Sequence, residues 1–277
     1  MKKEARVGTG MTQTGMAVTG AAMLCAAALN AAAGQPRLLA HRGGAHEQDE
    51  NTMAAFKASY DAGLRGFETD FRMTTDNRMV ILHDHTLEGK TDGKGFVEDK
   101  TYEELRPLRT KKTGQPLPTI EDFVAYFKDK PDTFTEYEMK MPVKELAYSD
   151  ERLEMYCRVM WEATRPMPPG TYCFTSFDHR VLRKMREMYP DAPTGLIGGT
   201  LDDKQIEVAK GLKVNQIACV MDVTTRKGIR EAQKAGFKVT GWPTVNEADY
   251  ALGVALGCDV ICTDIPIKLI EGVAKPK

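Results

Sequence analysis

The residues best suited to chemistry in this chain lie in two short histidine motifs and a segment between them. The motifs are His41-Arg42-Gly43 and His83-Asp84, and the segment is Phe67-Glu68-Thr69-Asp70-Phe71. Histidines exchange protons near neutral pH, and carboxylates bind hard cations. The guanidinium of Arg42 matches the geometry of a phosphate group. This combination predicts metal-dependent cleavage of a phosphodiester.

Carboxylates recur at the ends of two apolar runs. Because side chains alternate along a strand, Glu68 and Asp70 share one face. By the same alternation, Glu136, Glu138 and Lys140 share a face of a later run. Charges inside a barrel are costly unless ions compensate one another, so carboxylates stacked at neighbouring strand ends predict a bound cation. Oxygen ligands favour Mg²⁺ or Ca²⁺ over Zn²⁺. Taken singly, the first pair of carboxylates would also fit a salt-bridged strand end, and the second group a solvent-facing edge.

Other features suggest different chemistry less strongly. His83-Asp84-His85 resembles half of a zinc site but has no third nitrogen ligand nearby in the sequence. Asp92-Gly93-Lys94-Gly95 lacks the spacing and closing glutamate of an EF-hand and predicts a turn. Ser176 lacks the glycines of a nucleophile elbow. Trp242, at a predicted strand end, belongs either to the core or to a surface that packs against a substrate's carbon backbone.

Composition limits the classes of partner. The chain has 277 residues, of which 42% are hydrophobic and 28% charged, which is typical of one globular domain. The formal net charge of -1 provides no net field to attract nucleic acid or anionic lipid. An anionic ligand must therefore be held by a local group of side chains. The sequence does not indicate the oligomeric state.

The first 33 residues have the pattern of a secretory signal peptide. Lys2, Lys3 and Arg6 precede an alanine-rich apolar run over 16–33. Cleavage after Ala33 would leave an exported protein, periplasmic or extracellular, without stable membrane insertion. An uncleaved anchor and a lipoprotein signal at Cys25 are the alternatives.

The remaining residues, 34–277, have the length of a (β/α)₈ barrel, for which roughly 250 residues are typical. Short apolar runs alternate with longer amphipathic stretches, which predicts an α/β fold with a parallel sheet, a TIM barrel. Eight strands are expected at 37–41, 66–70, 133–138, 172–176, 194–198, 217–221, 238–242 and 259–263. Helices are expected at 52–62, 119–128, 143–164, 178–188, 202–210, 224–235 and 246–256.

A ninth apolar run, 79–83, does not fit the barrel count. Only a few residues, Thr74-Thr75-Asp76-Asn77-Arg78, lie in the connection from the preceding strand, whereas a parallel crossover needs about a dozen or more. It is therefore predicted to return as a hairpin, which places His83 near Asp70 at the carboxyl ends of the strands, where barrel active sites lie. Residues 87–118, rich in glycine and proline, are expected to form an excursion with a short helix near 102–108, able to shape substrate choice.

Five cysteines follow the signal segment. Cys258 and Cys262 flank one predicted strand and would lie roughly 13 Å apart, too far for a disulfide. Buried thiols without a disulfide framework are expected.

The chain resembles the glycerophosphodiester phosphodiesterases over nearly its whole length after the signal segment. The matching motifs are Leu39-Ala40-His41-Arg42-Gly43-Gly44, Glu50-Asn51-Thr52, Phe67-Glu68-Thr69-Asp70, Val80-Ile81-Leu82-His83-Asp84, Leu117-Pro118-Thr119, Glu136-Tyr137-Glu138-Met139-Lys140, Ser176-Phe177, Trp242 and Thr263-Asp264-Ile265-Pro266. The resemblance implies a barrel hydrolase that converts glycerophosphodiesters to an alcohol and sn-glycerol 3-phosphate.

The resemblance also implies roles for individual residues. His41 and His83 would act as acid and base. Glu68, Asp70 and Glu138 would hold one divalent cation, Mg²⁺ or Ca²⁺, and Arg42 and Lys140 would contact the phosphate.

The sequence departs from the family pattern at three places: Asp49 stands where a proline is usual, Pro243 follows Trp242, and Glu136 is an additional carboxylate. The second leaves the role of Trp242 open, and Glu138 is preferred to Glu136 as a ligand. A lysophospholipid or another phosphodiester as substrate, and a non-catalytic exported protein that binds phosphoesters, remain as alternatives.

Overall fold

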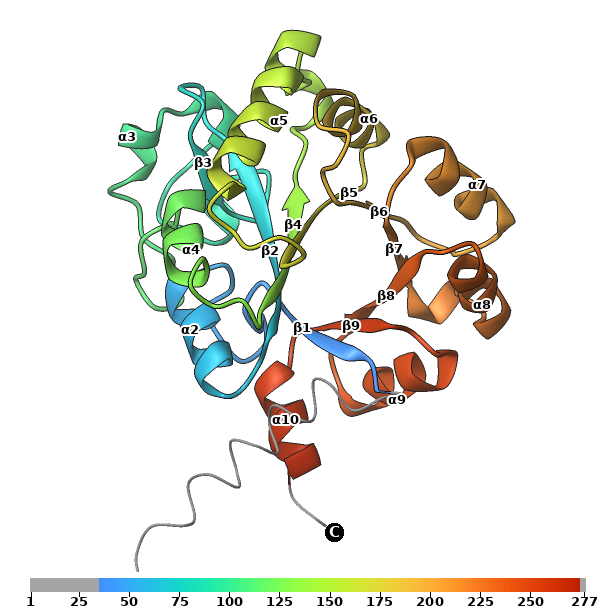
Figure 1. Cartoon of the computed structure of the whole chain (residues 1–277). Coiled ribbons are helices and arrows are strands. Elements are labelled where there is room, and N and C mark those ends of the chain that lie inside the picture. The colour runs from blue at the N-terminus through green and yellow to red at the C-terminus, as the bar shows by residue number, and fades with distance from the viewer. Residues whose placement is uncertain (1–34, 275–277) are drawn as a thin grey trace, which may run out of the picture.

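The computed structural model describes residues 35–274, in which eight parallel strands form a closed ring with helices around it (Figure 1). Pairing of β1 with both β2 and β9 closes the ring, so the predicted TIM barrel is confirmed. The barrel strands are β1 (Arg37–His41), β2 (Gly66–Met73), β4 (Phe134–Met139), β5 (Tyr172–Ser176), β6 (Thr194–Ile197), β7 (Gln216–Val220), β8 (Lys238–Thr244) and β9 (Val260–Thr263).

The ninth strand, β3 (Met79–Ile81), lies outside the ring and pairs antiparallel with β2. Phe71 lies opposite Ile81 and Met73 opposite Met79, so β2 continues three residues past Asp70 to form this hairpin. The predicted hairpin is therefore found. It returns the chain toward the carboxyl end of β2, where the Leu82 N–H donates to the Asp70 carbonyl over 3.1 Å.

Most helices begin where a polar side chain caps the first turn. Thr52, Thr119 and Asn246, for example, accept hydrogen bonds from amides of the turn that follows. The helices that surround the ring are α2 (Met53–Asp61), α4 (Ile120–Phe127), α5 (Asp150–Thr164), α6 (His179–Met188), α7 (Asp203–Leu212), α8 (Arg226–Lys234), α9 (Glu247–Leu256) and α10 (Pro266–Ala274).

One predicted helix was wrong at its start, and one helix was not predicted. The helix expected over 143–164 begins only at Asp150, where Ser149 caps it, and a short 3₁₀ turn at Lys144–Leu146 precedes it. Pro142 and the extended backbone of Val143 prevent a helix from starting at residue 143. Helix α10 was not predicted, although Pro266 at its first position is a common way to begin a helix.

The outer faces of the strands pack against the helices through aromatic side chains. Phe123 of α4 meets Phe56 edge to face at 4.9 Å between ring centroids and Tyr137 at 5.7 Å. Phe71 meets Tyr137 at 5.4 Å. These rings are fully buried, and burial of such large apolar surfaces is the main stabilising contribution on this side of the barrel.

The excursion after β3 has a small core of its own. It contains η1 (Leu87–Gly89), η2 (Val97–Asp99) and α3 (Tyr102–Leu105). Its buried apolar side chains, Leu87, Val97, Leu105 and Leu117, pack in one cluster with Val80 and Leu82 of the hairpin. Asp49 accepts hydrogen bonds from Thr110 and Thr113, each at 2.5 Å, and so ties the excursion to the loop after β1.

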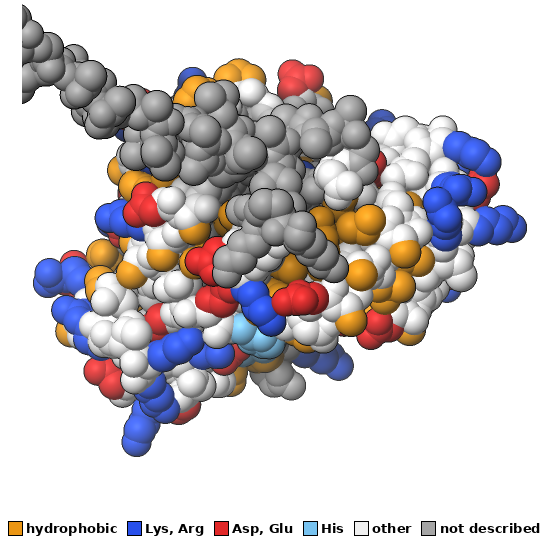
Figure 2. All heavy atoms as spheres, turned by 90° about the horizontal axis from the view of Figure 1, so that it is seen from below, with side chains coloured by type: hydrophobic (Ala, Val, Ile, Leu, Met, Phe, Trp, Pro, Cys, Tyr) orange, Lys and Arg blue, Asp and Glu red, His pale blue; other side chains and the backbone are white. Residues whose placement is uncertain are grey.

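The thiols, the helices and the surface charge of residues 35–274 complete the description of the fold. All five cysteines there are buried and free, as expected. No helix of the described part is long and apolar enough to cross a membrane. Basic and acidic side chains are interspersed on the face seen in Figure 2, in keeping with the net charge. The predicted signal peptide lies outside the described residues.

Candidate active site

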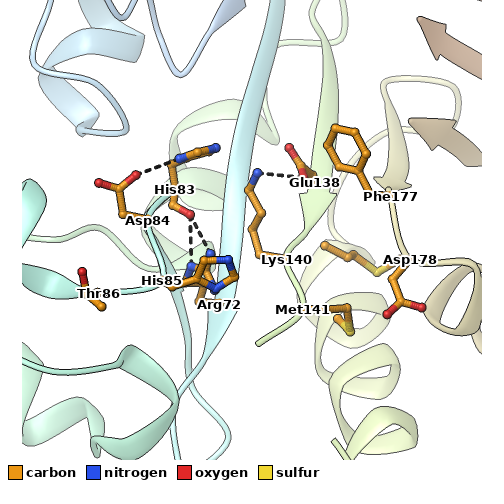
Figure 3. A pocket seen from close by; sticks show the side chains of 11 residues that line it. Arg72, His83, Asp84, His85, Thr86, Glu138, Lys140, Met141, Phe177 and Asp178 are labelled. Carbon is orange, nitrogen blue, oxygen red and sulfur yellow. Dashed lines mark hydrogen bonds and ion pairs between the residues drawn. The ribbon is translucent and has the colours of Figure 1, made fainter. Parts of the chain in front are cut away.

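The predicted site residues gather at the carboxyl ends of the strands, around one cavity of about 310 Å³. Its lining includes all the candidates except buried Asp70, namely His41, Arg42, Glu68, His83, Glu138, Lys140 and Trp242. An outer cleft of about 570 Å³ shares four of its lining residues, His83, Glu138, Lys140 and Phe177. Figure 3 shows this cleft, with Lys140 and Glu138 facing His83.

Three carboxylates form the acidic centre of the site. Glu68 and Asp70 come from β2 and Glu138 comes from the neighbouring β4, where Asp70 and Glu138 are register partners. One oxygen from each carboxylate lies within 4.8 Å of the other two, and all three residues are buried. The trio is thus close enough to share a single cation.

Two cations of the chain contact this centre. Lys140 Nζ lies 2.7 Å from Glu138 Oε1 and 3.1 Å from Asp70 Oδ1. Arg42 Nε lies 3.4 Å from Asp70 Oδ2, to which Asn51 also donates a hydrogen bond over 2.7 Å. Both predicted phosphate contacts therefore also compensate the buried carboxylates.

The pKa values of the carboxylates diverge. Burial raises the pKa of Glu68 well above its usual range, and the neighbouring charges of Asp70 and Glu138 add to the effect. Burial also raises the pKa of Glu138, against the opposing charge of Lys140. Burial alone would raise the pKa of Asp70 too, but Lys140 and Arg42 outweigh it and lower that pKa. The two chain cations therefore stabilise charge on Asp70 but do not fully compensate the other two carboxylates.

This imbalance fits a divalent cation held by the trio. Glu68 Oε1 is buried without a hydrogen-bond partner, and Asp70 Oδ1 has Lys140 nearby but no aligned hydrogen bond. Carboxylate oxygens without donors, in a set that has no sulfur or nitrogen ligand, suit a hard cation such as Mg²⁺ or Ca²⁺. Among residues 35–274, this trio is the one cluster of three or more acidic, histidine or cysteine side chains close enough together to hold an ion.

His41, at the end of β1, is oriented by a carboxylate that directly follows the last barrel strand. Its Nδ1 lies 2.5 Å from Asp264 Oδ1, which leaves Nε2 on the side of Glu68, 3.8 Å from Oε2. Burial favours the neutral carboxyl of Asp264, but the hydrogen bond and charge of His41 outweigh it and lower its pKa. Such a carboxylate fixes the ring orientation and stabilises the imidazolium.

His83 lies two residues beyond β3, and its ring is one-third exposed. Its Nδ1 lies 2.9 Å from Asp84 Oδ1. Burial lowers the pKa of His83, and the positive charges of Lys140 and Arg42 lower it further. The negative charge of Asp70 raises this pKa but does not offset them. Both predicted proton-transfer groups therefore line the same cavity, each bonded to a carboxylate.

The turn after His41 brings backbone close to the site. Arg42 and Gly43 have φ values of 53° and 80°, and the Arg42 N–H donates to Glu68 Oε2 over 3.2 Å. A Cβ on Gly43 would lie 2.8 Å from the Ala55 side chain, so this position requires glycine. The Arg42 guanidinium is held by Glu50 at 3.2 Å, beside the acidic centre.

Glu136 and Trp242 line the cavity but do not belong to the trio. Glu136 Oε1 accepts hydrogen bonds from Gln216 and Thr240, both at 2.8 Å, and burial raises its pKa to about 7. Trp242 meets Phe177 edge to face at 5.9 Å. The two rings form an apolar wall where a carbon backbone could pack.

Three other residues of the site were not assigned roles from the sequence. Asp264 orients His41, Asn51 bonds Asp70, and the half-exposed Phe177 packs against Trp242. Each lies within a motif that the family resemblance covered, and this is the signal by which all three could have been found. For Asp264, its position directly after a predicted strand is a second signal. Their partners come from elsewhere in the chain, so their functions depended on how the ring closes.

The competing features have structural explanations. Ser176 Oγ donates to the Met139 carbonyl over 2.8 Å. Asp92 Oδ1 accepts from the Arg109 amide, 17 residues later in the chain, so Asp92 holds two parts of the excursion together. His85 lines the outer cleft, and no zinc-type group of ligands surrounds it within the described residues.

Comparisons with known proteins agree with this geometry. The model of the Glycerophosphoryl diester phosphodiesterase family matches residues 41–268. A glycerophosphodiester phosphodiesterase of Caldanaerobacter subterraneus is 28% identical over 244 residues, which cover 86% of this chain and 98% of the relative.

Solved structures share the fold at lower identity. A phosphodiesterase of Oleispira antarctica, in complex with the product sn-glycerol-3-phosphate, superposes with a TM-score of 0.78 at 21% identity over 87% of this chain and 98% of its own. A glycerophosphodiester phosphodiesterase of Thermotoga maritima gives 0.68 at 19% identity, covering 86% and 98%. The family match spans both histidine motifs and the acidic trio, and the chain belongs to the glycerophosphoryl diester phosphodiesterase family.

Proposed function

We propose that this protein hydrolyses glycerophosphodiesters to an alcohol and sn-glycerol 3-phosphate by proton transfer between His41, His83 and the substrate. The observation that carries the proposal is that both imidazoles line the cavity that also borders the acidic trio. The substrate class is that named for the family and for its relatives, one of which was solved with sn-glycerol-3-phosphate bound.

A phosphodiester is an anion with a poor leaving group. Cleavage therefore needs charge neutralisation, an activated nucleophile and a proton for the departing oxygen. Arg42 and Lys140 place positive charge beside the cavity. One imidazole, neutral, takes a proton from the nucleophile, either water or the neighbouring glycerol hydroxyl, as the new P–O bond forms. The other, protonated, donates to the alkoxide whose P–O bond breaks; where the glycerol hydroxyl attacks, water then opens the cyclic phosphate. Asp264 and Asp84 keep the two rings oriented for these transfers.

Glu68, Asp70 and Glu138 would hold the divalent cation, for which we propose Mg²⁺ or Ca²⁺. When bound, the cation supplies positive charge that stabilises the developing negative charge on the phosphoryl oxygens. Lys140, paired with Asp70 and Glu138, remains on the cleft side of the trio, where Figure 3 shows it facing His83. It is therefore placed to contact a phosphate while it balances the carboxylates.

The proposal is tested by incubating the protein with glycerophosphocholine and Mg²⁺ or Ca²⁺ and following the products by ³¹P NMR. We expect sn-glycerol 3-phosphate from the unaltered protein and none above background from His41→Asn or His83→Asn. A cyclic phosphate before the final product would identify the glycerol hydroxyl as nucleophile. Cleavage of a lysophospholipid alone would change the substrate class, and tight binding without product would indicate a binding protein.

We also propose that the protein is exported, on the basis of the signal-like pattern over residues 1–33. Mass spectrometry of the protein isolated from its host tests this directly. A mature chain that begins at Gly34 supports the proposal, and an intact Met1 contradicts it.

A further inference from the structure

Arg72 is a buried cation outside the group of residues to which chemistry was assigned. It lies on β2 two residues after Asp70, and its side chain is 1% exposed. Long cationic side chains are almost never buried so completely unless they are paired. The partners of Arg72 therefore indicate its function.

Two of its three guanidinium nitrogens hold the main chain of His83. Nη2 donates to the His83 carbonyl over 2.7 Å and Nε donates to the same oxygen over 3.2 Å. Figure 3 shows both bonds, with the His83 ring extending from the anchored backbone toward Lys140. Arg72 is thus committed to the protein and is not free to bind a phosphate.

The anchored backbone has left the sheet. Strand β3 ends at Ile81, and the last main-chain bond to β2 is from Leu82 to Asp70. Within the described residues, the hydrogen bonds that the His83 carbonyl accepts come from Arg72. The sheet therefore positions Leu82, whereas Arg72 positions the residue that carries the imidazole.

The third nitrogen connects Arg72 to the excursion. Nη1 donates to Glu98 Oε1 over 2.8 Å, and the Glu98 side chain is 3% exposed. Glu98 belongs to η2, next to Val97 in the small core of the excursion. The carboxylate compensates the buried guanidinium and restricts the orientations from which it can reach His83.

We propose that Arg72 and Glu98 form a positioning pair that fixes the main chain of His83, so that its imidazole reaches the substrate only when the excursion is folded. The inference rests on the proposed role of His83 in proton transfer. The excursion then contributes to turnover through its fold, in addition to any contact that it makes with substrate. A misplaced proton-transfer group lowers kcat more than it weakens substrate binding.

The test uses two variants because removal of one partner leaves an uncompensated buried charge and can unfold the protein. The double variant Arg72→Met/Glu98→Met removes both charges and keeps the volume filled. Arg72→Lys keeps the charge paired with Glu98 but cannot make both bonds to the His83 carbonyl. In each we expect kcat for glycerophosphocholine to fall about 10-fold or more while KM stays within about two-fold.

A second readout does not depend on turnover. In protein labelled with ¹⁵N-histidine, the ring signals of His83 should shift in both variants, while those of the exposed His179, which has no contact with Arg72 or Glu98, should not. If the unaltered protein shows no hydrolysis, the proposed function fails, and the NMR shifts still decide whether the pair positions His83.

Arg78→Gln is the matched control. Arg78 precedes β3 on the same hairpin and makes an exposed ion pair with Glu121 at 3.5 Å, without contact to His83. We expect unchanged kcat and unchanged His83 signals. Folded variants of Arg72 with unaltered kcat and His83 signals would overturn the proposal, as would loss of folding in both, which would assign the pair to stability alone.

Discussion

Replacement of Asp264 by Asn isolates the contribution of one negative charge to the site. The Asp264 carboxylate lies 2.5 Å from His41 Nδ1, and asparagine can still accept this hydrogen bond through its amide oxygen. Its main-chain bond to Thr244 does not involve the side chain, so the fold should persist. What disappears is the charge that stabilises the imidazolium form of His41.

The expected loss follows from the strength of such a bond. A hydrogen bond to a charged group contributes about 1.5–3 kcal/mol, and one between neutral groups about 0.5–1.5 kcal/mol. Because asparagine keeps the neutral bond, the loss is the difference, about 1–1.5 kcal/mol, and kcat should fall about 5- to 13-fold. KM should change little, since Asp264 does not line the cavity and acts through His41.

Steady-state hydrolysis of glycerophosphocholine gives kcat and KM, and thermal unfolding monitors the fold. Asp132→Asn is the control, because Asp132 makes an exposed ion pair with Arg65 that is remote from the described site. A kcat for Asp264→Asn within about three-fold of the unaltered protein would refute the assignment of Asp264 as the group that orients His41.

Three further predictions concern the acidic centre. When Mg²⁺ or Ca²⁺ is added back to chelator-treated unaltered protein at about 100 times its Kd, the free energy of unfolding should rise by about 2.7 kcal/mol. Asp70→Asn should lose most of this stabilisation. An equal rise in Tm in both proteins would place the cation elsewhere. Glu136→Gln should retain kcat within about three-fold because its bonds to Gln216 and Thr240 place it outside the trio, and a loss of about 100-fold would make it a ligand. Burial raises the pKa of Glu138 above its unfolded value, so the folded protein binds the proton more tightly and stability is lost as pH rises through the folded pKa. With chelator present, Tm should therefore fall from about pH 5 to about pH 8, less steeply in Glu138→Gln, and equal slopes would contradict the assignment.

Much of the barrel was predictable because each strand is a short apolar run between turn signals. The hairpin was predictable from distance alone, since the few residues before Met79 cannot cross over the sheet. The start of α5 was not, because the amphipathic pattern continues through Val143 while Pro142 and the Ser149 cap set the actual boundary. Helix α10 lacks a polar capping side chain before Pro266 that would have marked it.

The site was predictable where its residues are close in sequence or follow strand alternation, as with Glu68 and Asp70. Contacts across the closed ring were not. Asp264 bonds His41 across 223 positions of sequence, and Glu98 reaches Arg72 from the excursion. A buried arginine two residues after Asp70 looks like any polar strand residue until its partners are known.

The most direct test of the account is a crystal structure of the protein with Mn²⁺ and sn-glycerol 3-phosphate. We predict an anomalous peak at roughly 2.0–2.4 Å from oxygens of Glu68, Asp70 and Glu138, the distances typical of oxygen-bound divalent cations. The phosphate should lie between the rings of His41 and His83. A metal bound away from the trio, or a phosphate out of reach of either imidazole, would contradict the account.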